Sequence, residues 1–303
     1  MPRIAFLSTD NLEDFFVYDE LLIPYFEAHN WDVQTVSWHD KTVIWDEFQY
    51  VIVRSTWDYQ QQPEAFMQCL TAIEQSQAIL LNPLSLIKWN IEKYYLQDLE
   101  SKGVATINTM WCKANSADVI DSLHSAFSQF KTSKVVIKPV LSANADNTFV
   151  VTPESIASTS TMLCEIFGQR SYMIQPFLSS VVEEGEYSLF FFSHHYSHAI
   201  RKVPKSGDFR VQEEHGGQLY CVEATQEQLA IAQRALAAMP DEALYARVDL
   251  VRQNTSWAVM ELELIEPSLY FNLDENSPTR FVTAMLDLHR KKSEKGSHSA
   301  EKL

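Results

Sequence analysis

The sequence is poor in glycine and cysteine, and both shortages exclude common kinds of site. Only seven glycines occur in 303 residues, and none falls into the GxGxxG or GxxxxGK[ST] spacing of Rossmann and P-loop nucleotide sites. The four cysteines, Cys69, Cys112, Cys164 and Cys221, lie far apart and form no CxxC pair. They indicate buried reduced thiols rather than a disulfide framework or a zinc site.

Basic residues are scarce as well, and long hydrophobic runs are absent. The 24 Lys and Arg residues against 40 Asp and Glu give a formal net charge of −16, which disfavours a nucleic-acid partner. No stretch of about 18 apolar residues could span a membrane, and the N-terminus lacks the pattern of a signal peptide. We therefore expect a cytoplasmic protein that acts on small molecules, with a homodimer as a reasonable assembly.

Short apolar runs alternate with amphipathic stretches through residues 1–88. The runs are Ile4–Leu7, Val33–Trp38, Tyr50–Val53 and Ile79–Leu81. This spacing predicts an N-terminal α/β domain with a parallel sheet. In such sheets ligands bind beyond the carboxyl ends of the strands, and the segment that begins at Arg54 lies at one of these ends.

Residues 89–290 predict an α+β domain instead. Asn90 can cap a helix that runs to Lys102, where Gly103 would end it. The later elements are two antiparallel strands at 135–137 and 149–151, a helix capped by Thr225 and Gln228, and a hairpin of 248–251 with 257–265. The tail at 291–303 is polar, and we predict that it is disordered.

The hairpin carries the strongest chemical signal, because three acids lie within its apolar strands. Glu261 and Glu263 are two residues apart and so share a face of a strand, and Asp249 can lie opposite them. Three carboxylates on one face would repel each other unless a cation lies between them, and such oxygen ligands suit magnesium. A solvated acidic strand face is the alternative, which we favour less because apolar residues surround the acids.

Two basic segments could hold the phosphates of a nucleotide. Lys138 closes the β-branched run of VVIKP and can act as a point charge, although a strand-end lysine is often only solvated. Lys202 and Arg210 belong to the segment 201–217, which holds three of the seven glycines. That segment reads either as a mobile surface loop or as a catalytic lid in which Arg210 stabilises charge on a transferred phosphoryl group.

Two further patterns are weaker. The segment QPFL at 175–178, followed by Glu186, could offer backbone groups to an adenine edge and a carboxylate to a ribose, but alone it is only a loop with an acidic turn. His194, His195 and His198 do not share one strand face and have no fourth ligand nearby, so a zinc site is disfavoured.

Taken in order, these motifs resemble the ATP-grasp superfamily, especially its glutathione synthetase and RimK-type branch. The order is Lys93, VVIKP, QPFL, EEGEYS, KVPKSGDFRVQEEHGG, RVD and MELELIEP, and the resemblance covers about residues 89–280. The segments VRSTWDY at 53–59 and WNIEKYYL at 89–96 look most like the D-cycloserine-forming ligases within it. The resemblance implies two subdomains that clamp ATP between antiparallel sheets, with a lid subdomain at about 108–176.

The resemblance also implies a role for each motif residue. Lys93 and Lys138 would contact the ATP phosphates, the backbone of Gln175, Pro176, Phe177 and Leu178 would take the adenine, and Glu186 the ribose. Lys202 and Arg210 would bind the γ-phosphate and an acyl phosphate, while Asp249, Glu261 and Glu263 would hold magnesium, with two ions expected. Arg54 is our candidate anchor for a substrate carboxylate.

Two departures from the family pattern stand out. The loop after Lys138 is usually rich in glycine, but here it reads SANADNT at 142–148. The last metal ligand is usually Asn, but here it is Glu263, which adds a negative charge.

The function implied is an ATP- and magnesium-dependent ligase that joins a carboxylate to an amine through an acyl phosphate, on a small amino-acid-like or peptide substrate. The alternatives are an ATP-grasp kinase that phosphorylates a hydroxyl and a non-catalytic nucleotide-binding module.

Overall fold

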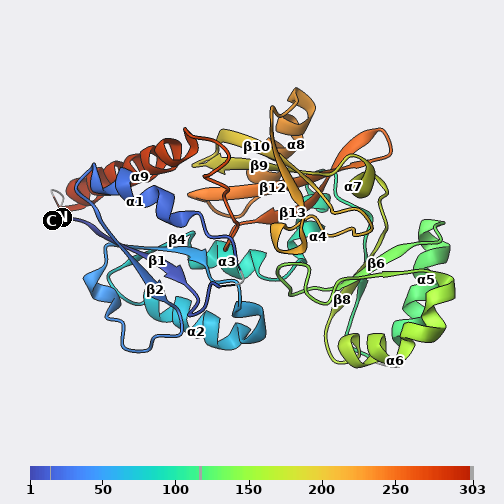
Figure 1. The fold of residues 1–303 in the computed structure, drawn as a ribbon. Helices are drawn as coiled ribbons and strands as arrows, with labels where there is room; N and C mark the ends of the chain where they lie inside the picture. The colour runs from blue at the N-terminus through green and yellow to red at the C-terminus, as the bar shows by residue number, and fades with distance from the viewer. Residues whose placement is uncertain (14, 116–117, 301–303) are drawn as a thin grey trace.

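Three β-sheets organise residues 1–13, 15–115 and 118–300, which are the residues that the computed structural model describes (Figure 1). The N-terminal sheet is parallel, with strand order β2-β1-β3-β4. Its strands are β1 (Arg3–Ser8), β2 (Asp32–Ser37), β3 (Tyr50–Ser55) and β4 (Ile79–Leu81), and its helices are α1 (Ile23–Glu27), α2 (Pro63–Glu74) and α3 (Leu84–Asn90).

Both faces of this sheet are covered, which explains why its strands are continuous apolar runs. Ile4 and Phe6 of β1 belong to a core that includes Phe26 of α1 and Phe281 of the C-terminal helix α9 (Ser277–Ala300). The alternate residues of β1 pack on the other side, in a core that includes Phe66 of α2. The predicted parallel α/β unit is confirmed.

The second sheet is antiparallel and stands at the far end of the molecule from the N-terminal sheet (Figure 1). Its order is β5-β8-β6-β7, with β5 (Met110–Cys112), β6 (Val135–Pro139), β7 (Phe149–Val151) and β8 (Tyr172–Pro176). Helices α5 (Val119–Phe130) and α6 (Ile156–Phe167) cover one face through a separate hydrophobic core. The predicted antiparallel pairing of 135–137 with 149–151 is confirmed.

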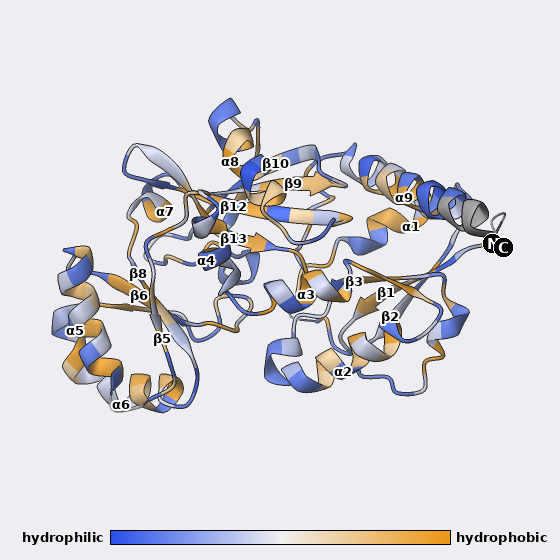
Figure 2. Ribbon diagram, turned by 180° about the vertical axis from the view of Figure 1, so that it is seen from behind, coloured by the Kyte–Doolittle hydropathy of each residue, from blue (hydrophilic) through white to orange (hydrophobic). Residues whose placement is uncertain are grey.

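The third sheet lies between the other two and has the order β11-β10-β9-β12-β13. Its strands are β9 (Glu186–Phe192), β10 (His195–Val203), β11 (Gln218–Val222), β12 (Tyr245–Gln253) and β13 (Ser256–Glu263). The helices α4 (Tyr95–Ser101) and α8 (Gln226–Ala237) pack against it, and α7 (Ser180–Glu183) precedes β9. Figure 2 shows hydrophobic residues along β12 and β13, and Val248, Leu250, Val259 and Leu262 belong to a core shared with α4 and α8. The predicted hairpin and the capping box at Thr225 are both confirmed.

Asn90 does not cap a helix, contrary to the prediction. It is the last residue of α3, and its side chain donates to the Leu262 carbonyl at 2.8 Å and accepts from the Leu264 amide at 3.0 Å. These two hydrogen bonds to the backbone of β13 and of the chain just beyond it outweigh the one hydrogen bond that Asn90 would make as a helix cap. The next helix, α4, therefore begins only at Tyr95.

The C-terminal tail also differs from the prediction. We predicted disorder over 291–303, but α9 continues to Ala300, while residues 301–303 lie outside the described residues. The first turns of α9 bury Phe281, Val282 and Met285, and the polar turns simply extend a helix that this contact has already formed. No helix in the described part of the chain is long and apolar enough to cross a membrane.

Candidate active site

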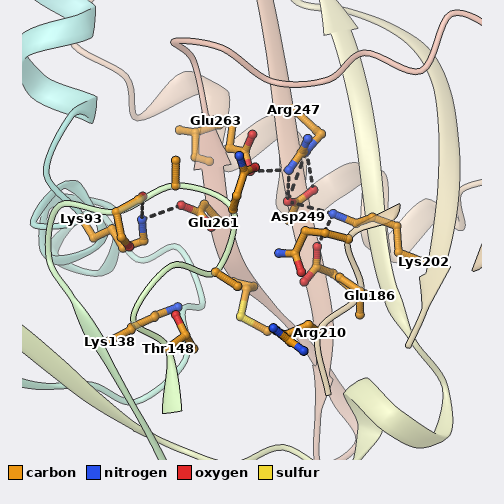
Figure 3. Close-up of a pocket in the computed structure, with 18 of the residues that line it drawn as sticks. Lys93, Lys138, Thr148, Glu186, Lys202, Arg210, Arg247, Asp249, Glu261 and Glu263 are labelled. Carbon is orange, nitrogen blue, oxygen red and sulfur yellow. Dashed lines mark hydrogen bonds and ion pairs between the residues drawn. The ribbon is translucent and has the colours of Figure 1, made fainter. Parts of the chain in front are cut away.

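One cavity lies where the second and third sheets face each other, and the N-terminal domain closes one end of it. Its walls bring together all of the predicted site residues except Arg54: Lys93, Lys138, Gln175, Pro176, Phe177, Leu178, Glu186, Lys202, Arg210, Asp249, Glu261 and Glu263. Most of these residues come from β6, β8, β9, β10, β12, β13 and the loops between them, and Lys93 comes from the segment between α3 and α4. Segments separated by more than a hundred residues in sequence thus build a single site (Figure 3).

The acidic residues lie side by side because of the register of the hairpin. Asp249 of β12 pairs with Glu261 of β13, and Arg247 pairs with Glu263, so all four side chains share one face. Asp249 is 2% exposed, whereas Glu261 and Glu263 keep about a quarter of their side-chain surface open, at 27% and 26%. The spacing argument for the acids therefore describes their placement correctly.

Two basic side chains, Arg247 and Lys202, form ion pairs with these acids (Figure 3). Arg247 donates to Asp249 at 2.9 Å and also contacts Glu263. The Lys202 ammonium lies 3.3 Å from Asp249 and contacts Glu186 as well. Glu186 and Asp249, the two partners of Lys202, are both buried, so direct ion pairs replace the hydration of these charges. Removing any one member of this network would leave a buried charge without compensation.

The network sets the protonation of its members. Burial alone would raise the pKa of Asp249, but Arg247 and Lys202 outweigh burial and hold that pKa well below its usual range. Burial raises the pKa of Glu263 to about 8, with Arg247 opposing the rise and Asp249 adding to it.

Lys93 and Lys138 approach the acids from the opposite side. The Lys93 ammonium lies 2.9 Å from Glu261 and donates to the Ser142 carbonyl, also at 2.9 Å. Lys138 ends the buried strand β6, and burial lowers the pKa of its ammonium, although Glu261 opposes that effect. Within the described residues no carboxylate forms an ion pair with Lys138. An ammonium that faces a cavity in this way is suited to a phosphate.

The acidic group fits magnesium by the chemistry of its donors. Asp249 and Glu261, opposite each other, and Glu263, one position further, offer the carboxylate oxygens that this ion prefers. As the side chains stand, no group of three or more His, Cys, Asp or Glu in the described ranges is arranged to hold a metal. Lys93, Lys202 and Arg247 form ion pairs with these carboxylates, so a bound cation would have to displace part of their contacts.

The glycine-poor loop after Lys138 uses left-handed backbone in place of glycine. Asn144, Ala145 and Asn147 have φ values of 51°, 56° and 51°, and the loop from Ser142 to Thr148 lines the cavity. Asn tolerates this conformation better than other residues with a side chain. The loop thus lines the site without glycine, and the Thr148 side chain lies beside Lys138 (Figure 3).

The segment expected to read adenine is only partly free to do so. The Gln175 side chain turns to donate to the Thr109 hydroxyl at 2.9 Å, and the Phe177 amide donates to the Lys134 carbonyl at 3.0 Å. All four residues from Gln175 to Leu178 line the cavity. Any backbone donor to an adenine edge must therefore come from a residue other than Phe177.

Arg210 lies in the loop between β10 and β11. Its guanidinium forms a two-pronged pair with Asp208, at 3.1 Å and 2.7 Å, and its side chain is 38% exposed. Glu213 of the same loop accepts a hydrogen bond from the Tyr18 hydroxyl at 3.1 Å. The loop thus lies over the cavity and is tied to the N-terminal domain.

Comparisons with known proteins agree with this geometry. The prokaryotic glutathione synthetase ATP-grasp domain matches residues 107–267, which is more than half of the chain. The chain belongs to the ATP-grasp family of glutathione synthetase type. It is therefore an ATP-dependent ligase of the class that forms carbon–nitrogen bonds, and its sheets form the two-subdomain ATP-grasp fold.

The N-terminal domain narrows the relationship. Residues 4–82 match the N-terminal domain of D-cycloserine synthetase DcsG. The cycloserine biosynthesis protein DcsG of Streptomyces lavendulae is 29% identical over 274 residues, which cover 84% of this chain and 88% of that protein. The crystal structure of D-cycloserine synthetase DcsG superposes with a TM-score of 0.82 at 27% identity, over 94% of this chain and 99% of the other. A D-alanine–D-alanine ligase from Bacillus anthracis shares the fold at 12% identity, with a TM-score of 0.67 over 97% and 100% of the two chains.

Arg54 does not fit the role predicted for it in this ATP-grasp protein. Its side chain is 1% exposed, does not line the cavity, and pairs with Asp19 at 2.8 Å. It also donates to the Pro267 carbonyl at 3.0 Å. The guanidinium fastens the N-terminal domain to the chain that follows β13, so it cannot serve as a direct substrate anchor in this conformation.

Sequence reasoning missed several residues of the site. Arg247 carries most of the contacts to the acids, and its signal was available, because it lies two residues before Asp249 and so shares its strand face. Tyr59 and Glu266 also line the cavity, at the end that the N-terminal domain closes. No local pattern marks that pair, since 207 residues of sequence separate its members.

Proposed function

We propose that this chain uses ATP and magnesium to activate a carboxylate as an acyl phosphate and then joins it to an amine. The observation that supports this most directly is one shared cavity, in which Lys138 faces the acidic hairpin and its partner Arg247 and has no ion-pair partner among the described residues. Basic groups for a triphosphate and oxygen ligands for a divalent cation are thus placed across one space.

Each group has a part in the first step. Lys93 and Lys138 hold the phosphates, and Asp249, Glu261 and Glu263 would hold the metal, with two ions proposed. Magnesium, when bound, would neutralise phosphate charge and polarise the phosphorus–oxygen bond. The substrate carboxylate oxygen forms a bond to the γ-phosphorus, and the bond to the β-phosphate oxygen breaks. Arg247 and Lys202, both buried beside the acids, can then stabilise the negative charge.

The second step forms the new bond. The amine nitrogen attacks the carbonyl carbon and loses a proton, while the carbon–oxygen bond to phosphate breaks and phosphate leaves with the electron pair. Water would destroy the acyl phosphate, so the site must be closed during this step. The loop that holds Arg210, tied to the N-terminal domain by Tyr18 and Glu213, is the segment we propose to close it.

The relatives point to the substrate class. One is named for D-cycloserine synthesis, and a structural neighbour is named for joining two D-alanines. We propose a small D-amino-acid-like substrate that presents a carboxylate and an amine.

The test is a product analysis with the purified chain, ATP, magnesium and a panel of D- and L-amino acids and their derivatives. Phosphate release together with a product lighter than its substrates by one water supports the ligase. A stable phosphate ester without a condensed product would instead indicate phosphorylation of a hydroxyl and contradict the proposal.

A further inference from the structure

Glu266 lies in the cavity at the end that the N-terminal domain closes, and its backbone is fixed on both sides. The Trp57 indole donates to the Glu266 carbonyl at 2.8 Å. The next carbonyl, of Pro267, accepts from buried Arg54 at 3.0 Å. Two side chains from the carboxyl end of β3 and the turn beyond it thus hold this short segment in place.

The Glu266 side chain is also positioned by the N-terminal domain. Its carboxylate interacts with the hydroxyl of Tyr59, whose side chain is 4% exposed and packs on Phe66. A buried tyrosine has few rotamers available, so the direction of the carboxylate is restricted. Both side chains line the cavity.

Glu266 differs from the three acids of the hairpin in one respect. Asp249, Glu261 and Glu263 each form an ion pair with a lysine or an arginine. Across the described ranges Glu266 has no such pair. Burial raises the pKa of Glu266 to about 7, and Tyr59 and the charge of Lys93 only partly oppose the rise.

A carboxylate in this position favours a cationic ligand. Placing a charge in a poorly solvated cavity is costly, and a ligand ammonium would offset that cost by supplying the missing positive charge and a hydrogen bond. The same site would disfavour a ligand with a second carboxylate or a neutral hydroxyl at this point. Glu266 lines the same cavity as Lys93 and Glu261, so the ligand group would be bound in the cavity that holds the proposed reaction centre.

We propose that Glu266 is a specificity residue that receives the ammonium of the amino-acid-like substrate, with Tyr59 as its positioning residue. This inference rests on the proposed ligase function and adds to it the group that selects an amine-bearing substrate.

The experiment measures phosphate release by the full chain with ATP, magnesium and a panel of D- and L-amino acids, each beside its des-amino analogue, such as propionate for D-alanine. The variants are Glu266→Gln, which keeps the shape of the side chain but removes its charge, and Tyr59→Phe. Glu275→Gln, an exposed glutamate outside the cavity, is the matched control.

We expect Glu266→Gln to raise the KM for the amino acid by at least about tenfold while the KM for ATP stays within about twofold. Its preference for amino acids over des-amino analogues should fall by a similar factor. Tyr59→Phe should act in the same direction by about threefold, and it keeps the inference testable if Glu266→Gln does not fold. The control should match the wild type.

Two results would contradict the inference and are distinct from each other. An unchanged amino-acid KM in both cavity variants overturns the role of Glu266 but leaves the ligase function standing. A wild-type chain that releases no phosphate with any panel member contradicts the ligase function, and the inference falls with it.

Discussion

Replacing Lys202 by Met should destabilise the protein more than any change to an exposed lysine. The Lys202 side chain is 3% exposed and contacts Glu186 and Asp249, whose side chains are 10% and 3% exposed. Removing one partner of a buried ion pair costs about 3–5 kcal/mol because the other charge is left uncompensated. Arg247 still holds Asp249 in the variant, so we expect the lower end, about 3 kcal/mol.

The assay is equilibrium unfolding in urea, which does not screen charges as guanidinium would. Lys205→Met, an exposed lysine close by in the chain, is the control and should change stability by less than about 0.5 kcal/mol. Adding Glu186→Gln to Lys202→Met should recover part of the loss, because it removes the uncompensated carboxylate.

The loss should also depend on pH in a defined direction. Without Lys202, burial raises the pKa of Glu186 further above its unfolded value, so the folded state binds more protons than the unfolded state. Stability of the variant then falls as pH rises through this range, and its gap to the wild type is smaller at about pH 5 than at about pH 8. A loss below about 1 kcal/mol, or no recovery with Glu186→Gln, would refute the network described above.

Three further predictions concern other parts of the structure. Lys138→Ala should weaken ATP binding by roughly 30-fold or more, measured by calorimetry, since a charge-assisted contact is worth about 2 kcal/mol; unchanged affinity would contradict the phosphate role. Glu261→Ala should abolish magnesium-dependent phosphate release while leaving the far-ultraviolet circular dichroism intact, and persisting turnover would place the metal elsewhere. Burial lowers the pKa of His198 from 6.5 to about 4, so stability should be lost as pH falls between these values, by up to about 3 kcal/mol. His198→Gln should flatten that pH dependence in urea titrations, and an unchanged slope would show that other groups cause it.

Local sequence patterns predicted much of the fold because its elements are regular. The strands of the N-terminal sheet are buried on both faces and therefore appear as apolar runs. The shared face of Glu261 and Glu263 was predictable because side chains two apart on a strand point to the same side, whereas the pairing of Asp249 with Glu261 depends on the register of the hairpin.

The errors arose where a distant partner decides what a side chain does. Arg54 lies at a strand end where ligands often bind, but its guanidinium is bound by the Asp19 carboxylate and the Pro267 carbonyl. Neither residue is close to Arg54 in the sequence. Asn90 has the residue type of a helix cap, yet its bonds go to the backbone around Leu262. We predicted disorder over residues 291–300 from their polar composition alone. They continue helix α9, whose first turns are held in place by buried side chains such as Phe281.

Isotope transfer tests the central claim most directly. A substrate whose carboxylate carries oxygen-18 is turned over with ATP and magnesium, and the released phosphate is examined by phosphorus NMR. Activation as an acyl phosphate predicts that each phosphate carries one oxygen atom from the substrate carboxylate. Phosphate that holds no substrate oxygen would contradict this chemistry.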